Sequence, residues 1–170
     1  MTTIAQTPRL VVRRFTPDDA AFFLELLNDP GWIANIGDRG VRTVEAARDY
    51  IRDKMLAAYE RMGFGMYVVE LKDGTPIGTA GLVKRPALDD ADLGFAFLPA
   101  WRGAGYARES AAAMLSHAWN DFALERMLAI VAPHNAPSVR LLEALGFGFE
   151  RRVTLPNDTE ELLLYALAAP

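Results

Sequence analysis

The chain has no cysteine among its 170 residues, which excludes a disulfide framework, a zinc–thiolate site and a cysteine nucleophile. It also lacks any apolar run approaching the roughly 20 residues that a membrane-spanning helix needs. No basic segment followed by an apolar stretch lies near its start, so we expect no signal peptide. We therefore expect a cytoplasmic protein with no membrane partner.

Neither sign of charge is in large excess, because 18 Lys and Arg face 22 Asp and Glu, for a net charge of −4. This acidic balance argues against a nucleic-acid partner. Apolar residues make up 51% of the chain, which excludes an intrinsically disordered protein. The length suits a single domain, residues 1–170, that buries roughly 70% of the surface of its unfolded chain.

Hydrophobic periodicity predicts secondary structure in the order β-α-α-β-β-β-α-β-α-β-β, which is typical of a mixed α/β sheet. Strands are expected at residues 9–15, 64–71, 77–83, 92–98, 126–132, 147–154 and 160–168. Helices are expected at residues 16–28, 43–63, 107–122 and 135–146. Residues 31–42 are expected to form a loop. His117 faces away from the apolar stripe of its helix and is expected to be exposed.

A glycine-rich turn joins the strand 92–98 to the following helix, and it contains Arg102, Gly103 and Gly105. Glycine lets a backbone turn tightly and approach a ligand closely, and a helix start suits an anion such as a pyrophosphate. A turn that only reverses the chain explains the same residues. Position 108 is Arg where the dinucleotide fingerprint needs glycine, so we set aside a dinucleotide-binding oxidoreductase.

A second distinctive segment, residues 135–147, reads N-A-P-S-V-R-L-L-E-A-L-G-F. Asn135 as a helix cap and Gly146 as the helix end account for it structurally.

Together the two segments resemble the GNAT N-acetyltransferase superfamily. R-x-x-G-x-A, at residues 102–107, is similar to its acyl-coenzyme A (CoA) pyrophosphate loop, and N-x-x-S-x-x-L-L-E-x-L-G-F, at residues 135–147, to its second conserved block. The strand Asp92-Leu93-Gly94-Phe95 also resembles a strand of this family. The opening strand and its Thr-Pro-x-Asp turn resemble the branch that contains the ribosomal-protein N-terminal acetyltransferases.

The resemblance implies a mixed α/β fold, with a central sheet of about seven strands flanked by four helices. Two parallel strands, 92–98 and 126–132, would splay apart and hold acetyl-CoA, the acyl donor, between them. The resemblance places backbone pairing to the pantetheine arm at Phe97 and Leu98, and a contact to the pantetheine or the leaving thiol at Asn135. It places the pyrophosphate against Arg102, Gly103, Ala104, Gly105, Tyr106 and Ala107.

The acceptor implied is a primary amine, either a protein N-terminus or a small amine. An alkyl ammonium has a pKa near 10, so a proton must be removed before the amine can attack. Asp92 holds the acidic position of its strand and is the candidate base, with a solvated strand-start residue as the alternative. The aromatic residues that could line the acceptor pocket are Trp32, Tyr50, Tyr67 and Phe95.

The chain departs from the family at position 142, where many members have a tyrosine that protonates the leaving thiolate and this chain has leucine. Ser138 is the candidate substitute, with a helix-capping role as the alternative. His134 either lies near the thiol or fills a loop. No metal is expected, because the acidic pair Asp89 and Asp90 lacks the glycine and distal glutamate of a calcium loop.

These features favour an acetyl-CoA-dependent N-acetyltransferase that transfers the acetyl group directly within a ternary complex. The rival is a non-catalytic acyl-CoA-binding module that keeps the cleft without turnover. A homodimer and a monomer both stay open.

Overall fold

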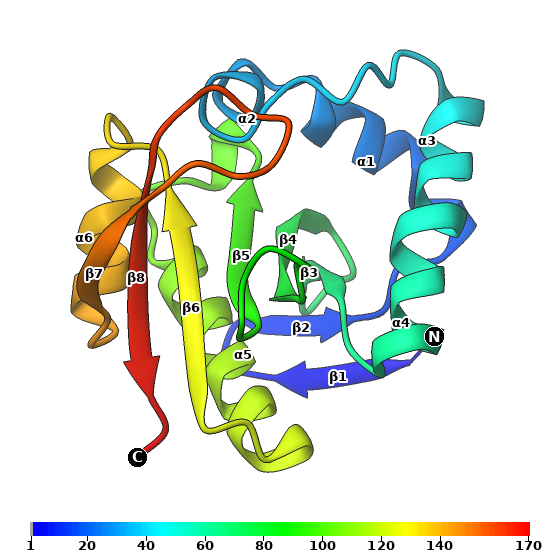
Figure 1. Cartoon of the computed structure of the whole chain (residues 1–170). Coiled ribbons are helices and arrows are strands. Elements are labelled where there is room, and N and C mark those ends of the chain that lie inside the picture. Colours follow the sequence, from blue (N-terminus) through cyan, green and yellow to red (C-terminus); the bar gives the residue numbers. More distant parts are fainter. Residues whose placement is uncertain (1) are drawn as a thin grey trace.

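A single eight-stranded sheet, in the order β1-β2-β3-β4-β5-β6-β8-β7, organises this computed structural model, which describes residues 2–170 (Figure 1). Neighbouring strands are antiparallel except β5 and β6, which are parallel. The strands are β1 (Thr3–Gln6), β2 (Leu10–Arg13), β3 (Met66–Leu71), β4 (Pro76–Val83), β5 (Asp92–Phe97), β6 (Arg126–Val131), β7 (Gly148–Val153) and β8 (Leu162–Ala168).

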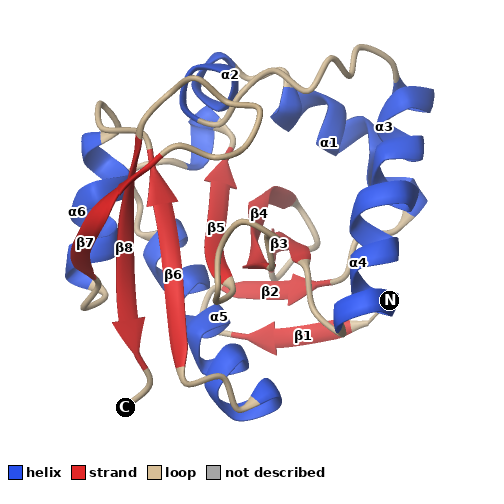
Figure 2. Cartoon of the chain, viewed as in Figure 1, coloured by secondary structure: helices blue, strands red, loops and turns tan. Residues whose placement is uncertain are grey.

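Helices cover both faces of this sheet (Figure 2). They are α1 (Ala20–Leu27), α2 (Pro30–Asn35), α3 (Val44–Tyr50), α4 (Ala57–Met62), α5 (Tyr106–Phe122) and α6 (Ala136–Ala144), and a π-helical turn, Ile51–Leu56, joins α3 to α4. No helix in residues 2–170 is both long enough and apolar enough to cross a membrane.

Alternate residues of β3 pack in two of the three hydrophobic clusters formed by the described residues. Tyr67 and Val69 pack in the cluster that contains α5 and α6, whereas Val68 packs in the cluster formed by α1, α2 and α3. This period of two is the one expected for a strand buried on both faces.

Several local predictions from the sequence are confirmed. Thr43 caps α3 by accepting a hydrogen bond from the Ala46 amide at 3.1 Å. Gly63 ends α4 with a φ of 81°, a left-handed conformation that favours glycine. The mixed α/β architecture is also as expected, with one strand more than the seven predicted.

Two elements, β1 and α2, were not predicted from the sequence. The extra strand, β1, has only four residues, Thr-Ile-Ala-Gln, which is too short to show an alternating pattern, and it becomes regular by pairing with β2. The prediction of a continuous loop over residues 31–42 was wrong, because α2 occupies the beginning of this segment. The Asp29 carboxylate caps this helix by accepting from the Trp32 amide at 3.1 Å, and Pro30 begins it. Residues 28–31, which the sequence predicts as the end of the first helix, therefore also begin the next helix.

The prediction that His117 is exposed was wrong, because its side chain is only 8% exposed. Its Nε2 lies 3.0 Å from the hydroxyl of Tyr67, and its Nδ1 contacts the Asp121 carboxylate. Burial also raises the pKa of Tyr67 to about 12. A polar partner on β3 thus allows α5 to bury a wider face than its apolar stripe indicates.

A buried cluster of three charged side chains joins β2, β3 and the start of α1. Arg13 forms a bidentate pair with Asp19, at 2.8 and 2.9 Å, and its Nε lies 2.9 Å from a Glu70 oxygen. All three residues are less than one-tenth exposed. The two carboxylates hold the pKa of Arg13 above its usual value. The Asp19 carboxylate also accepts from the Thr16 amide at 2.8 Å, so the cluster fixes the capping turn.

We expect Arg13→Met to lower the free energy of unfolding by about 3–5 kcal/mol, because it leaves Asp19 and Glu70 buried without a counter-charge. Urea denaturation measures this. The control is Arg152→Met, which breaks an exposed pair with Glu161 and should cost less than about 1 kcal/mol. Equal losses in the two variants would contradict a structural role for the Arg13 cluster.

Candidate functional site

The two parallel strands of the sheet separate soon after they meet. β5 and β6 pair at one position, Asp92 with Leu128, where the Leu128 amide donates to the Ala91 carbonyl at 2.9 Å. Beyond that point β5 stays paired with β4, and β6 stays paired with β8. Each strand keeps its outer neighbour, so an opening forms between them.

Unpaired backbone groups of β5 face this opening. The Leu98 amide donates to the Ile77 carbonyl at 3.0 Å, within the sheet. Because hydrogen-bonding direction alternates along a strand, Leu93, Phe95 and Phe97 must point their N–H and C=O groups toward β6. Phe97 therefore has its backbone groups on the side of the opening, where its carbonyl accepts from Arg102 Nε at 3.0 Å. Leu98 already uses its amide in the sheet.

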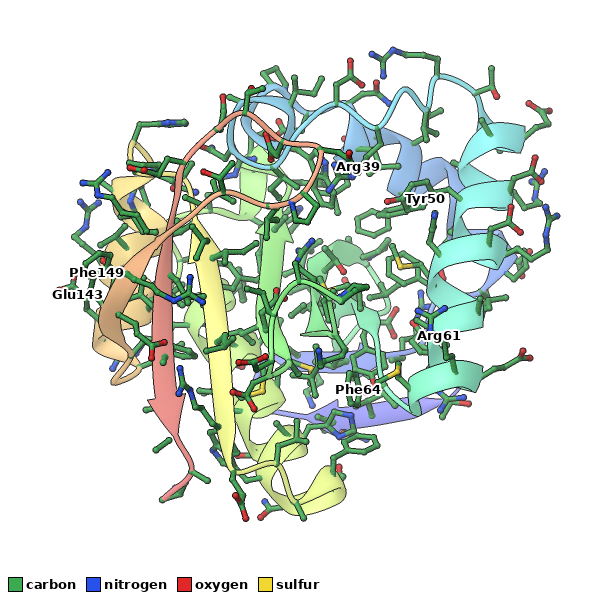
Figure 3. All side chains as sticks on the ribbon, viewed as in Figure 1. Arg39, Tyr50, Arg61, Phe64, Glu143 and Phe149 are labelled. Atoms are coloured by element: carbon green, nitrogen blue, oxygen red, sulfur yellow. The ribbon has the colours of Figure 1, made fainter. Side chains whose placement is uncertain are left out.

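The opening belongs to a cleft of about 1580 Å³ that lies between the sheet and the helices α2 to α4. Its walls also include the start of α5, the first turn of α6 and the β7–β8 loop. Trp32, Tyr50 and Phe95 line the cleft, as proposed from the sequence, and Figure 3 shows Tyr50 on the side of α3 that faces the sheet. Tyr67 does not line it, because that ring stacks on Tyr59 in the core beside α5.

The glycine-rich turn has a backbone that few other residues adopt. Gly103 and Gly105 have φ values of 80° and 84°, in the left-handed region, and Gly105 caps α5. The Glu109 amide donates to the Gly105 carbonyl at 3.0 Å. The amides of Tyr106, Ala107 and Arg108 come before Glu109 in the first turn of the helix, so they have no helical carbonyl to which they can donate. The turn therefore presents a row of donors at the positive end of the helix dipole.

Arg102 ties the turn to its surroundings. One of its terminal nitrogens pairs with the Asp29 carboxylate, which is almost fully buried, while its Nε holds the Phe97 carbonyl. The same carboxylate caps α2. Arg102 therefore links β5, α2 and the turn, and its guanidinium is already committed to protein partners.

Arg9, which the sequence analysis did not select, supports the turn from the other side. Its Nη1 donates to the Ala104 carbonyl at 2.9 Å, and its Nε lies 2.8 Å from Glu109. The guanidinium also stacks over the Tyr106 ring at 4.3 Å. Nothing in the sequence signals this role, because Arg9 is about a hundred residues away and only the position of α5 against β1 and β2 brings it here.

Asn135 and Ser138 lie together at the first turn of α6 and both line the cleft. The Asn135 side chain caps the helix by accepting from the Ser138 amide at 3.4 Å. The Ser138 hydroxyl makes no hydrogen bond with residues 2–170, so it is not the cap. Leu142 is buried against the cleft, whereas His134 is exposed and does not line it.

Asp92 lines the cleft at the beginning of β5, and it is only 1% exposed. The alternative that Asp92 is a solvated strand-start residue is therefore wrong. Its carboxylate lies 2.9 Å from Arg85 Nε. Burial raises the pKa of Asp92 to about 6, although Arg85 and Lys84 act in the opposite direction. A carboxyl group with such a pKa exchanges a proton close to neutral pH.

No group of three or more His, Asp or Glu side chains within residues 2–170 is arranged to hold a metal ion.

Comparison with known proteins places this geometry in a family. Residues 9–148 match the family model described as an acetyltransferase (GNAT) domain. The chain is 28% identical over 166 residues to the uncharacterized N-acetyltransferase YnaD of Bacillus subtilis, covering 95% of this chain and 94% of that relative.

Solved structures share the fold. An acetyltransferase of the GNAT family from Bacillus anthracis superposes with a TM-score of 0.78 at 25% identity, over 96% of each chain. Mycobacterium smegmatis RimJ, in complex with CoA-disulfide, superposes with a TM-score of 0.78 at 23% identity, over 99% of this chain and 90% of that one. The match over residues 9–148 is decisive: the chain belongs to the GNAT acetyltransferase family and is an acyltransferase.

Proposed function

We propose that this protein transfers an acetyl group from acetyl-CoA to a primary amine by direct transfer within a ternary complex. The observation that carries the proposal is the unpaired edge of β5, which runs from Asp92 to a glycine turn at the start of α5. An extended chain with a pyrophosphate at one end matches these two features in order. The RimJ structure, which has the same fold, contains CoA-disulfide.

The donor is proposed to bind in two parts. The amides of Tyr106, Ala107 and Arg108 hold the pyrophosphate, and the open backbones of Gly103 and Gly105 let it approach. The pantetheine arm pairs with β5 as an added strand, through the Phe97 amide and the backbone of Phe95. Arg102 acts by holding the turn and the Phe97 carbonyl in place.

The amine nitrogen attacks the thioester carbonyl carbon, a C–N bond forms and the C–S bond breaks. Asp92 is the proposed acceptor of the amine's proton, directly or through a water molecule. The leaving thiolate takes a proton from the Ser138 hydroxyl, which has no partner in residues 2–170 and regains a proton from water in the cleft as the first one leaves, while Asn135 contacts the pantetheine or the thiol. A backbone N–H on β5 stabilises the oxyanion that develops on the carbonyl.

A non-catalytic acyl-CoA-binding module would use the same cleft. Release of free thiol from acetyl-CoA, measured with and without a panel of amines, separates the two functions. Thiol release that depends on an amine supports the transferase. Tight CoA binding without release would favour the module.

Gly105→Val is expected to weaken CoA binding at least tenfold, about 1.4 kcal/mol. The left-handed φ at this position is unfavourable for a branched side chain, and an added Cβ would lie 3.3 Å from Arg9. Calorimetric titration measures the affinity. The control is Gly74→Val, which strains a φ of 91° at a hairpin tip outside the cleft and should leave the affinity unchanged. Equal affinities in both variants would mean that the turn at Gly105 is structural only.

Asp92→Asn is expected to lower kcat/KM by roughly 10²–10⁴-fold, the usual loss for a general base. Wild-type kcat/KM should fall as the pH drops through about 6, because Asp92 becomes protonated there, and the variant should lose this acidic limb. CoA affinity should hardly change. Ser138→Ala should instead slow the release of thiol and keep the acidic limb.

Thermal unfolding provides the control for Asp92. The folded protein holds the Asp92 proton more tightly than the unfolded chain, so this residue's contribution to stability declines as the pH rises from about 4 to about 6. The uncharged asparagine should therefore not lower Tm at pH 7. A variant with normal kcat/KM and an unaltered pH profile would eliminate Asp92 as the base.

A further inference from the structure

The charge of the cleft is opposite to the charge of the protein. Acidic residues outnumber basic ones in the whole chain, 22 to 18, yet the cleft is lined by eight Lys or Arg and only four Asp or Glu. Two of the four, Asp29 and Asp92, are buried in ion pairs with Arg102 and Arg85. A cleft with low-dielectric walls focuses such a field and favours anions.

The helical run from α3 to α4 presents only basic charge to the cleft, whereas its remaining surface carries both signs, including Arg48 and Arg52. Its two charged residues that line the cleft, Lys54 and Arg61, are both basic, and they share the face that is turned to the cleft. Neither forms an ion pair with a residue in 2–170. The four acidic residues of this run do not line the cleft: Glu45, Asp49, Asp53 and Glu60.

The wall across from these helices adds positive charge near Asp92. Lys84 lines the cleft beside Arg85, and its ammonium group donates to the carbonyls of Arg85 and Leu88. These neutral acceptors fix the position of Lys84 without cancelling its charge. The cleft that holds Asp92 therefore carries basic residues both on its helices and at the end of β4.

The donor's phosphates do not explain these cations. The amides proposed to hold the pyrophosphate follow the end of β5, where Arg102 and Arg108 also line the cleft. Figure 3 shows Arg61 on α4, level with the beginning of β5. The two remaining acidic residues of the lining, Asp158 and Glu160, are on the β7–β8 loop, which lies at the opposite end from α4 in the view of Figure 1.

We propose that the acceptor is an anionic amine, in which a carboxylate or phosphate lies close to the amino group that is acetylated. Lys54 and Arg61 bind this anionic group while the amino group lies at Asp92. This inference rests on the proposed transferase function and specifies its substrate class. A neutral or cationic amine of the same size gains nothing from Lys54 and Arg61, so the wild-type protein discriminates against it.

The test compares kcat/KM for matched acceptors that differ only in charge. Phosphoethanolamine with ethanolamine, and β-alanine with β-alaninamide, represent small amines; a Ser-Asp-Asp peptide with a Ser-Asn-Asn peptide represents protein N-termini. We expect at least one anionic member to exceed its neutral partner by about tenfold or more, the effect of two weak charge contacts. Added salt should reduce that preference, because it screens exposed charges.

For any pair in which the wild-type protein prefers the anionic acceptor, the ratio of the two kcat/KM values should fall to no more than about twofold in the double variant Lys54→Gln/Arg61→Gln. The change should come mainly from a higher KM for the anionic acceptor. Arg48→Gln is the matched control. Arg48 lies on α3, is exposed and does not line the cleft, so its loss should leave the ratio unchanged. CoA affinity should be the same in all of these proteins.

If kcat/KM for the neutral amines equals that for their anionic partners, the inference is overturned, although the transferase function still stands. A preference that persists in the double variant, or falls equally in Arg48→Gln, would also overturn it. Absence of thiol release with every amine tested would instead overturn the proposed function, and the two failures are thus distinct.

Discussion

The structure depends on one feature of hydrogen bonding: two parallel strands that share a single point of pairing. β5 and β6 meet at Asp92 and Leu128, and each then follows its outer antiparallel neighbour. Unpaired N–H and C=O groups are costly when buried, so an exposed strand edge of this kind favours a ligand that completes it. The cleft, its open backbone groups and the turn at its end all follow from this separation.

Ion pairs between distant segments hold the cleft in shape. Arg13 joins the start of α1 to the sheet, Arg102 joins the glycine turn to α2, and Arg9 joins the same turn to the β1–β2 edge. Each arginine also contacts a backbone carbonyl or a second carboxylate, which fixes its orientation. The turn can therefore keep its left-handed glycines in place without help from a ligand.

The environment of Asp92 results from opposing influences. Burial beside β6 favours the neutral carboxyl and Arg85 favours the carboxylate; burial has the larger effect. A carboxyl group with a pKa of about 6 is then present in the cleft at the point where β5 and β6 pair. Lys54 and Arg61 on the helices, and Lys84 at the end of β4 on the facing wall, add positive charge to the cleft in which we propose the acceptor binds.

The sequence alone determined the family and most of the framework, because these depend on local patterns: periodicity, the caps at Thr43 and Gly63, and the two motifs around Gly105 and Asn135. It did not determine β1 or α2, whose short segments become regular through pairing and capping. Only the tertiary structure placed Arg9 at the glycine turn, buried His117 and Asp92, and brought Lys54 and Arg61 to one wall of the cleft. Burial and charge surroundings are sums over segments distant in the chain, and no local pattern encodes them.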